Sequence, residues 1–269
     1  MRPFLKWAGS KKWLVRKGVP SPRRGYYRYI EPFLGSGAVF FDTLPERALL
    51  SDSNAYLVNC FIQIRENWQG VHSAYQDLFS DHSEASYYKT RSELSAAGAL
   101  GAAQFLYLNR TCFNGVFRVN LSGRFNVPIG SKISNPFKRE DFEAWSVALA
   151  QAEIRNDDFE EVIDRAGIGD FIFIDPPYTV AHNKNGFIEY NEKIFSWEDQ
   201  VRLAETVCKA QKRGAQFALT NANHVSVREL YGDQFSVQEV DRRSAIAGDA
   251  GKRQMISEIV VTSFEPTFQ

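Results

Sequence analysis

Long apolar runs and cysteine pairs are both missing from this chain of 269 residues. No stretch approaches the roughly 18 to 20 apolar residues of a membrane-spanning helix, and the N-terminal residues lack the apolar core and cleavage site of a signal peptide. The three cysteines, Cys60, Cys112 and Cys208, form no Cys-x-x-Cys pair, so neither a disulfide framework nor a zinc site is indicated. We therefore expect a soluble, cytoplasmic protein with buried thiols.

The overall composition is that of an ordinary globular protein. Hydrophobic residues make up 44% and charged residues 24% of the chain, which sets aside disordered, collagen-like and coiled-coil proteins. The length suits one or two domains and is ample for a hydrophobic core.

Acidic residues are missing from two segments, although the whole chain carries 32 basic and 32 acidic residues. Residues 1–30 and 94–139 contain no Asp or Glu, and the remainder is strongly acidic. Chance clustering on solvated faces is the plain alternative, but the polarity of the chain favours binding of a polyanion by these two segments. Their basic residues are Arg2, Lys6, Lys11, Lys12, Arg16, Lys17, Arg23, Arg24, Arg28, Arg110, Arg118, Arg124, Lys132, Lys138 and Arg139.

Short apolar runs alternate with helical stretches, which predicts an α/β sheet with crossovers. The runs are continuous in their apolar residues, as expected for parallel strands covered on both faces. The predicted strands are Tyr26–Ile30, Ala48–Ser51, Asp170–Ile174, Gln216–Thr220 and Ser257–Phe264. The predicted helices are Ala38–Thr43, Ala55–Asn67 and Trp197–Arg213, the last with Ser196 as its N-cap and Gly214 at its end.

The stretch from about Asn54 to Trp145 breaks this rhythm and is predicted to be an insertion. Its first half is mostly helical, and it is rich in turns from Asn109 onward. Within it, residues 116–121 and 124–127 flank Ser122-Gly123, a dipeptide typical of a two-residue hairpin turn. Such a hairpin would project Arg118 and Arg124 from the surface, where a basic ribbon can enter a DNA groove.

Two features indicate a nucleoside cofactor. The segment Tyr29-Ile-Glu-Pro-Phe-Leu-Gly-Ser-Gly37 places two glycines between a predicted strand and a helix, where a ligand can approach the backbone closely. Asp52 follows the next strand, at the place where nucleotide-binding sheets keep a carboxylate for the ribose hydroxyls. Each feature alone has a structural reading, as a simple turn or a helix cap, and together they favour the cofactor.

The tetrapeptide Asp175-Pro176-Pro177-Tyr178 directly follows an apolar strand and carries the most specific signal. An exocyclic aromatic amine is a poor nucleophile, and methylating it requires acceptors that draw the NH₂ group toward a pyramidal geometry. Asp175 supplies a carboxylate, and two stiff prolines leave the Pro176 carbonyl to accept the second hydrogen. Tyr178 provides a face on which an extruded base can stack. A rigid turn is the plain alternative for such a motif.

These residues resemble the Dam-like, D12 class of adenine methyltransferases, which act on DNA and use S-adenosylmethionine (AdoMet). The similar segments are Phe4-Leu-Lys-Trp-Ala-Gly-Ser-Lys11, with Ser10 in place of a family glycine, the loop 31–37, Ser51-Asp-Ser-Asn54, Asp175–Tyr178, and the recognition segments 109–115 and 123–128. The resemblance implies a Rossmann-like catalytic domain of residues 1–54 and 146–269, with residues 55–145 as an inserted, mostly helical target-recognition domain that bears the hairpin. It covers nearly the whole chain.

The resemblance also implies roles for single residues. The cofactor would contact Trp7, Lys11, Phe33, Gly35, Ser36, Asp52, Asp158 and Phe159, although an acidic turn and a core aromatic remain open for the last two. Double-stranded DNA would contact Lys6, Phe113, Asn114, Val116, Arg118, Arg124 and Pro128. Arg118 would bind a guanine edge, with Lys6 as a second base contact. Phe113 would fill the gap left by the flipped base, with a core position as the plain alternative. The late loop Asp241–Arg253 would lie near phosphates.

The expected activity is transfer of a methyl group from AdoMet to N6 of an adenine flipped out of duplex DNA. No metal and no covalent intermediate are expected, and the protein would act as a monomer or as a dimer on DNA. GATC is the expected target, with GATATC still open, as is pairing with a restriction enzyme. The alternatives are an N4-cytosine or RNA amino-methyltransferase and a DNA-binding regulator without turnover.

Overall fold

The computed structural model describes residues 1–22, 24–120, 122–131, 133, 135–180, 195–243 and 255–265. In this part of the chain seven strands form one sheet, in the order β3-β2-β1-β4-β5-β7-β6. The chain divides into two compact units, which we call the first and the second unit. The first comprises residues 1–15, 34–46 and 50–156, and the second comprises residues 16–33, 47–49 and 157–269. The assignment of residues 55–145 as a recognition domain stays a prediction.

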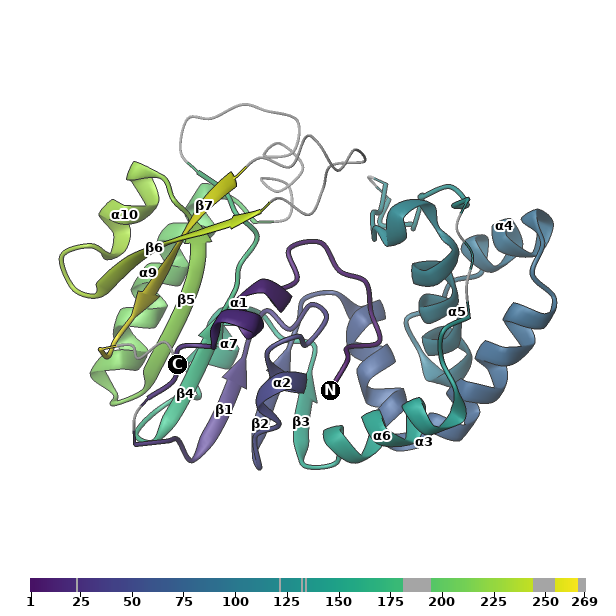
Figure 1. Cartoon of the computed structure of the whole chain (residues 1–269), viewed down its shortest axis with the longest axis horizontal. Helices are drawn as coiled ribbons and strands as arrows, with labels where there is room; N and C mark the ends of the chain where they lie inside the picture. Colours follow the sequence, from purple (N-terminus) through teal and green to yellow (C-terminus); the bar gives the residue numbers. More distant parts are fainter. Residues whose placement is uncertain are drawn as a thin grey trace. The chain divides into compact units, whose positions relative to one another are not determined.

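The strands are β1 (Arg28–Glu31), β2 (Ala48–Ser51), β3 (Ala152–Arg155), β4 (Asp170–Ile174), β5 (Gln216–Ala222), β6 (Ser236–Arg243) and β7 (Met255–Thr262). The second unit contains β1, β4, β5, β7 and β6 (Figure 1). β1 and β5 pair in parallel with β4, whereas β7 runs antiparallel to both β5 and β6. All five predicted strands are present, and each end lies within two residues of its predicted position. β3 and β6 were not predicted, because neither contains a continuous apolar run: β3 alternates polar and apolar residues, and β6 is mostly polar.

The helices of the second unit include α7 (Phe159–Ile163), α9 (Trp197–Lys212) and α10 (Val225–Tyr231). α9 begins as predicted at Ser196, whose hydroxyl accepts from the Asp199 N–H at 3.2 Å while Asp199 Oδ2 accepts from the Ser196 N–H at 2.9 Å. It ends before Gly214, which has a φ of 93°. Residues from these helices and the central strands form a continuous apolar core.

The first unit is largely helical. Its main helices are α2 (Phe40–Thr43), α3 (Ala55–Ser80), α4 (Glu84–Ser92), α5 (Gly98–Thr111) and α6 (Arg139–Leu149), and α1 (Lys12–Lys17) spans the boundary of the two units. Asn54 caps α3 by accepting from the backbone of Tyr56 and Leu57. The predicted end of this helix, Asn67, is a kink with φ −145° and ψ 49°, after which the helix continues. α3 packs against α5 and α6, and α4 packs against α5.

The predicted two-residue turn at Ser122-Gly123 is wrong by one residue. The Asn120 N–H donates to the Arg124 carbonyl at 2.9 Å, so Asn120 pairs with Arg124 and not with Phe125. Gly123, with a φ of 74°, has the left-handed backbone typical of hairpin turns. Asn120 Oδ1 fixes the turn by accepting from the backbone of Ser122 and Arg124. The described residues form an isolated antiparallel bridge at Val119 and Phe125, without a strand on either side.

Candidate cofactor and catalytic site

Any residue larger than glycine at position 35 would force the neighbouring Trp7 or the loop to shift. Gly35 has a φ of +48°, and an added Cβ would lie 2.9 Å from Trp7 Cδ1 and 3.2 Å from Trp7 Nε1. The next residue, Ser36, is buried and shares a hydrogen bond of 3.0 Å with the Ser10 hydroxyl. The first unit therefore joins the N-terminal motif and the glycine loop, as the predicted cofactor residues Trp7, Gly35 and Ser36 require.

Asp52 ties the acidic motif to the same loop. Its Oδ2 accepts from the Gly35 N–H at 2.9 Å and its Oδ1 accepts from the Asn54 N–H at 3.0 Å. Burial raises the pKa of this carboxyl above its ordinary value of 3.8, and the two backbone donors offset only part of that effect. Each carboxylate oxygen keeps a second acceptor site, which is the chemistry that ribose hydroxyls need.

Lys11, another predicted cofactor residue, is only 4% exposed. Its ammonium donates to the Gly9 carbonyl at 3.1 Å. The side chain therefore lies within the N-terminal motif and is not part of a polyanion-binding surface.

The tetrapeptide Asp175–Tyr178, predicted to be catalytic, belongs to the second unit and is held by polar side chains. The Thr220 hydroxyl donates to Asp175 Oδ1 at 2.8 Å, and the Tyr178 hydroxyl donates to Glu258 Oε2 at 2.8 Å. Burial, followed by Asp175 and Glu258, raises the pKa of Tyr178 well above its ordinary value, so the phenol stays protonated. The hydroxyl is thus anchored at one end of the ring, and the side chain remains partly exposed.

A buried glutamine braces the backbone of this tetrapeptide. Gln200, with no exposed surface, donates to the Pro177 carbonyl at 3.1 Å. Its own carbonyl accepts from Asn221 Nδ2 at 3.0 Å. Since α9 and β5 each contribute one member, two elements of the second unit fix the position of the two prolines.

Three aromatic rings, those of Phe33, Phe159 and Phe195, form a cluster in the second unit. Phe33 follows β1, just as Asp175 follows the parallel strand β4. The Phe33 ring stacks on Phe159 with centroids 5.4 Å apart, and each of these rings contacts Phe195. The structure therefore brings two predicted cofactor residues, Phe33 and Phe159, together.

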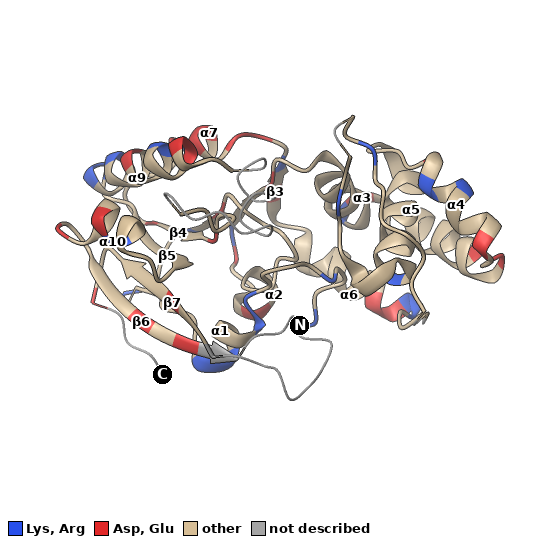
Figure 2. Cartoon of the chain, turned by 90° about the horizontal axis from the view of Figure 1, so that it is seen from above, with Lys and Arg blue, Asp and Glu red and all other residues tan. Residues whose placement is uncertain are grey.

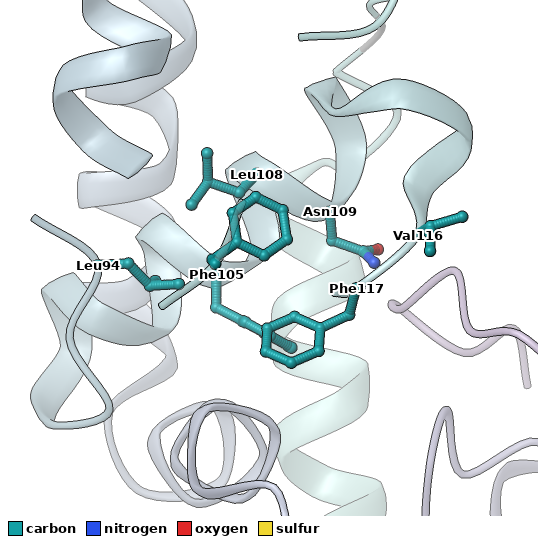
Figure 3. Close-up of a pocket in the computed structure, with 7 residues that line it drawn as sticks. Leu94, Phe105, Leu108, Asn109, Val116 and Phe117 are labelled. Carbon is teal, nitrogen blue, oxygen red and sulfur yellow. The ribbon is translucent and has the colours of Figure 1, made fainter. Parts of the chain in front are cut away.

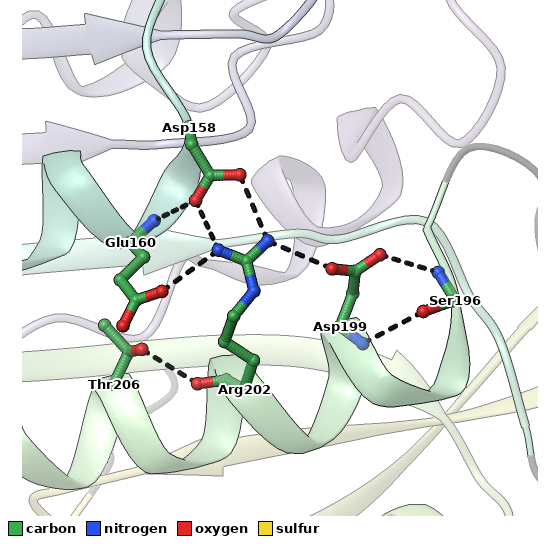
Figure 4. A network of polar contacts seen from close by, with 6 residues as sticks. All are labelled: Asp158, Glu160, Ser196, Asp199, Arg202 and Thr206. Carbon is green, nitrogen blue, oxygen red and sulfur yellow. Dashed lines mark hydrogen bonds and ion pairs between the residues drawn. The ribbon is translucent and has the colours of Figure 1, made fainter.

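Asp158 precedes this cluster and is part of an ion-pair network (Figure 4). Arg202 binds both of its carboxylate oxygens, at 2.6 and 3.1 Å, and also contacts Glu160 and Asp199. Burial alone would raise the pKa of Asp158, but the hydrogen bonds from Arg202 and the Glu160 N–H lower it overall. The guanidinium also lies 4.1 Å from the centroid of Phe159. Figure 2 shows acidic and basic residues side by side on α7 and α9.

The predicted DNA residues of the first unit are exposed, namely Lys6, Phe113, Asn114, Val116, Arg118, Arg124 and Pro128. Phe113 is 55% exposed although it is a large apolar ring. Asn114 has a φ of 55°, a left-handed backbone that is uncommon outside glycine. Burial, and then the nearby Arg110, lowers the pKa of Lys6.

Asn126, on the other side of the turn, orients the Arg118 side chain. Arg118 Nε donates to Asn126 Oδ1 at 2.9 Å, and the Asn126 N–H donates to the Arg118 carbonyl at 3.1 Å. Among the described residues no acceptor contacts the two terminal nitrogens of this guanidinium. The predicted two-residue turn would have paired Arg118 with Val127, so it did not predict the contact with Asn126.

Two further basic residues counted as polyanion contacts, Arg28 and Arg110, have structural roles. Arg28 pairs with Asp170 at 2.7 Å, where β1 and β4 begin. Arg110 is 4% exposed, donates to the Phe4 carbonyl and lies 4.3 Å from the centroid of Phe137. The predicted phosphate loop falls at residues 244–253 outside the described residues, as do Arg23 and Lys132.

Local sequence patterns do not reveal the residues that hold the predicted ones, namely Thr220, Gln200, Glu258, Asn126 and Arg202. Thr220, Gln200 and Glu258 are buried polar residues within regular elements, and such residues require partners. Cys60 and Cys112 are buried as expected, whereas Cys208 is half-exposed. No helix among the described residues is long and apolar enough to cross a membrane, and no cluster of potential metal ligands was found among them.

The fold and these motifs are those of a methyltransferase class, with a glycine loop after β1, a carboxylate after β2 and a rigid polar tetrapeptide after β4. A model of the D12 class N6 adenine-specific DNA methyltransferases matches residues 7–246. A type II methyltransferase of Lactococcus lactis subsp. cremoris is 32% identical over 98% of this chain and 96% of its own length. A DNA adenine methylase of Vibrio cholerae serotype O1 is 31% identical over 96% of this chain and 95% of its own length.

A DNA N-6-adenine-methyltransferase of Escherichia phage P1 is also similar, at 34% identity over 96% of this chain, which spans 35% of that protein. The chain therefore belongs to the D12 class N6 adenine-specific DNA methyltransferase family. It is an adenine DNA methyltransferase, and its substrate is DNA.

Proposed function

We propose that the protein transfers the methyl group of AdoMet to N6 of an adenine that is flipped out of duplex DNA, within the sequence GATC. The observation that carries this proposal is the tetrapeptide after β4, in which Thr220 holds the Asp175 carboxylate and Gln200 holds the Pro177 carbonyl. Fixed acceptors stabilise charge as it develops on the amine without reorganising during the reaction.

The residues present fit AdoMet as methyl donor. The absence of a side chain at Gly35 lets the Trp7 ring pack against the backbone of the glycine loop, which joins two of the proposed cofactor residues. Within the first unit, Asp52 offers carboxylate oxygens for the ribose hydroxyls beside the glycine loop. When bound, AdoMet supplies an electrophilic methyl group on a sulfonium centre.

In the chemical step, the adenine nitrogen forms a bond to the methyl carbon while the carbon–sulfur bond breaks. Asp175 and the Pro176 carbonyl accept the two amino hydrogens and orient the nitrogen lone pair toward the methyl group. The Tyr178 ring, anchored through Glu258, gives the flipped base a surface for stacking. The nitrogen then loses one proton, which the Asp175 carboxylate accepts.

The exposed residues of the segment 113–128 supply the proposed contacts to duplex DNA. Phe113 has the exposed apolar ring that can fill the space of an extruded base. Arg118, held through Nε by Asn126, can present its terminal nitrogens to the O6 and N7 atoms of one guanine. GATC is the proposed target because the recognition segments resemble those of the Dam-like methyltransferases.

The test replaces Asp175 by alanine. Methyl transfer from radiolabelled AdoMet to duplex DNA should fall to background, whereas calorimetry should show AdoMet affinity within about threefold of the wild type. Appreciable turnover by this variant would refute the role of Asp175. The target is tested with duplexes that differ from GATC at a single base pair, and equal transfer to all of them would contradict the proposed site.

A further inference from the structure

Residues at the C-terminal end of α5 form hydrogen bonds with the backbone of the N-terminal segment. Asn109 forms a reciprocal pair with the backbone of Lys6, because its Oδ1 accepts from the Lys6 N–H at 2.8 Å and its Nδ2 donates to the Lys6 carbonyl at 2.8 Å. The next residue, Arg110, donates to the Phe4 carbonyl. Asn109 is 4% exposed, so its polar atoms satisfy the protein and not the solvent.

The same Asn109 also holds the turn that carries Phe113 and Asn114. Its Nδ2 donates to the Gly115 carbonyl at 3.2 Å. Gly115 in turn has a φ of +65°, and an added Cβ would lie 2.5 Å from Lys6 Cδ. The turn therefore packs directly against Lys6, and the side-chain amide of Asn109 binds the backbone of both Lys6 and Gly115.

The residue after Lys6 reaches the cofactor loop. The Trp7 ring blocks any side chain at Gly35, and it stacks on Phe117 with centroids 5.7 Å apart and an angle of 22°. Phe117 is adjacent in sequence to Val116 and Arg118, two proposed DNA contacts. Figure 3 shows Asn109, Val116 and Phe117 around one apolar pocket.

We propose that Asn109 is a positioning residue that couples occupancy of the cofactor loop to recognition of the target DNA. Any displacement of Trp7 that accompanies cofactor binding passes to Lys6 along the backbone, and Asn109 ties Lys6 to the 113–115 turn. Without that tie, the two ligands would each still bind, but neither would alter the affinity of the other. This inference rests on the proposed function.

The measurement is the affinity of a GATC duplex with and without saturating S-adenosylhomocysteine, the demethylated cofactor, which permits no turnover. For the wild type we expect the cofactor product to raise duplex affinity at least about fivefold, the lower end of typical coupling between sites. Asn109→Ala should reduce this factor to about one while S-adenosylhomocysteine affinity stays within about threefold.

Asn59→Ala is the matched control. Asn59 is a buried asparagine of the same unit whose Nδ2 donates to a backbone carbonyl, that of Gly98, at 3.1 Å. Loss of this buried amide should leave the coupling factor unchanged. If Asn109→Ala, like Asn59→Ala, keeps the coupling factor of the wild type, Asn109 has only a structural role and the proposal is overturned.

A second measurement needs no variant. In the wild type, S-adenosylhomocysteine should slow hydrogen exchange at the amides of Lys6 and Gly115, and unchanged exchange there would also overturn the proposal. If the wild type does not bind S-adenosylhomocysteine at all, the proposed function fails. If it binds and duplex affinity is independent of it, only the coupling fails.

Discussion

Replacing Gly35 by alanine should both destabilise the protein and weaken its hold on the cofactor. The backbone there has a φ of +48°, and alanine in left-handed backbone costs about 1–2 kcal/mol. The new methyl group would also lie 2.9 Å from Cδ1 of Trp7, which is an atom of a rigid ring, so one of the two residues must shift. Overpacking of this kind costs about 1–3 kcal/mol.

Gly25 provides the control for the backbone cost alone. Its φ is +72°, and an added Cβ would meet no described atom within 4 Å. Gly25→Ala should therefore lose about 1–2 kcal/mol of unfolding free energy, and Gly35→Ala about 1–3 kcal/mol more. Only the second variant should bind S-adenosylhomocysteine more weakly, because it alone displaces Trp7.

Urea unfolding followed by circular dichroism gives the two free energies, and calorimetry gives the affinities. Equal losses of stability in the two variants would show that the contact with Trp7 has no energetic weight. Unaltered cofactor affinity in Gly35→Ala would remove the glycine loop from the proposed cofactor site.

Three further substitutions test the other assignments. Burial raises the pKa of Asp52, so its carboxyl stays protonated in the folded protein at pH values where the unfolded chain has released the proton, and cofactor affinity should fall as the pH drops through that raised pKa. Asp52→Asn should bind the cofactor more weakly, with an affinity that does not depend on pH over this range. A parallel pH dependence in both proteins would disprove the role of Asp52 in cofactor binding. Arg118→Ala should cost about 1–3 kcal/mol of discrimination at one guanine, whereas an equal loss on nonspecific DNA would make it a phosphate contact. Gln200→Leu, which frees the Pro177 carbonyl, should lower kcat with little change in KM for AdoMet, and a wild-type kcat would refute bracing of the tetrapeptide.

Much of the sheet could be predicted because its central strands are buried on both faces. The runs Ala48–Ser51 and Asp170–Ile174 are continuous in apolar residues and form β2 and β4 with the predicted bounds. The start of α9 was also predictable, since the cap formed by Ser196 and Asp199 is local in sequence. The motifs after β1, β2 and β4 were readable for the same reason.

The contacts that hold these motifs join residues far apart in the chain, and local patterns do not reveal them. Glu258 lies 80 residues from Tyr178, and Asn109 lies 103 residues from Lys6. The predicted register of the hairpin was wrong for a different reason, because Asn120 pairs with Arg124 where a two-residue Ser122-Gly123 turn would pair it with Phe125. Counts of charge also misled, since they do not distinguish the buried Arg110 from an exposed guanidinium.

The central claim is methyl transfer to the exocyclic nitrogen of adenine in DNA. The most direct measurement incubates the protein with radiolabelled AdoMet and two GATC duplexes, one of which carries N6-methyladenine in place of the target adenine on both strands. The account predicts label in the unmodified duplex alone. Equal label in both duplexes would contradict the proposed atom, and no label in either duplex or in unmethylated genomic DNA would contradict the proposed reaction.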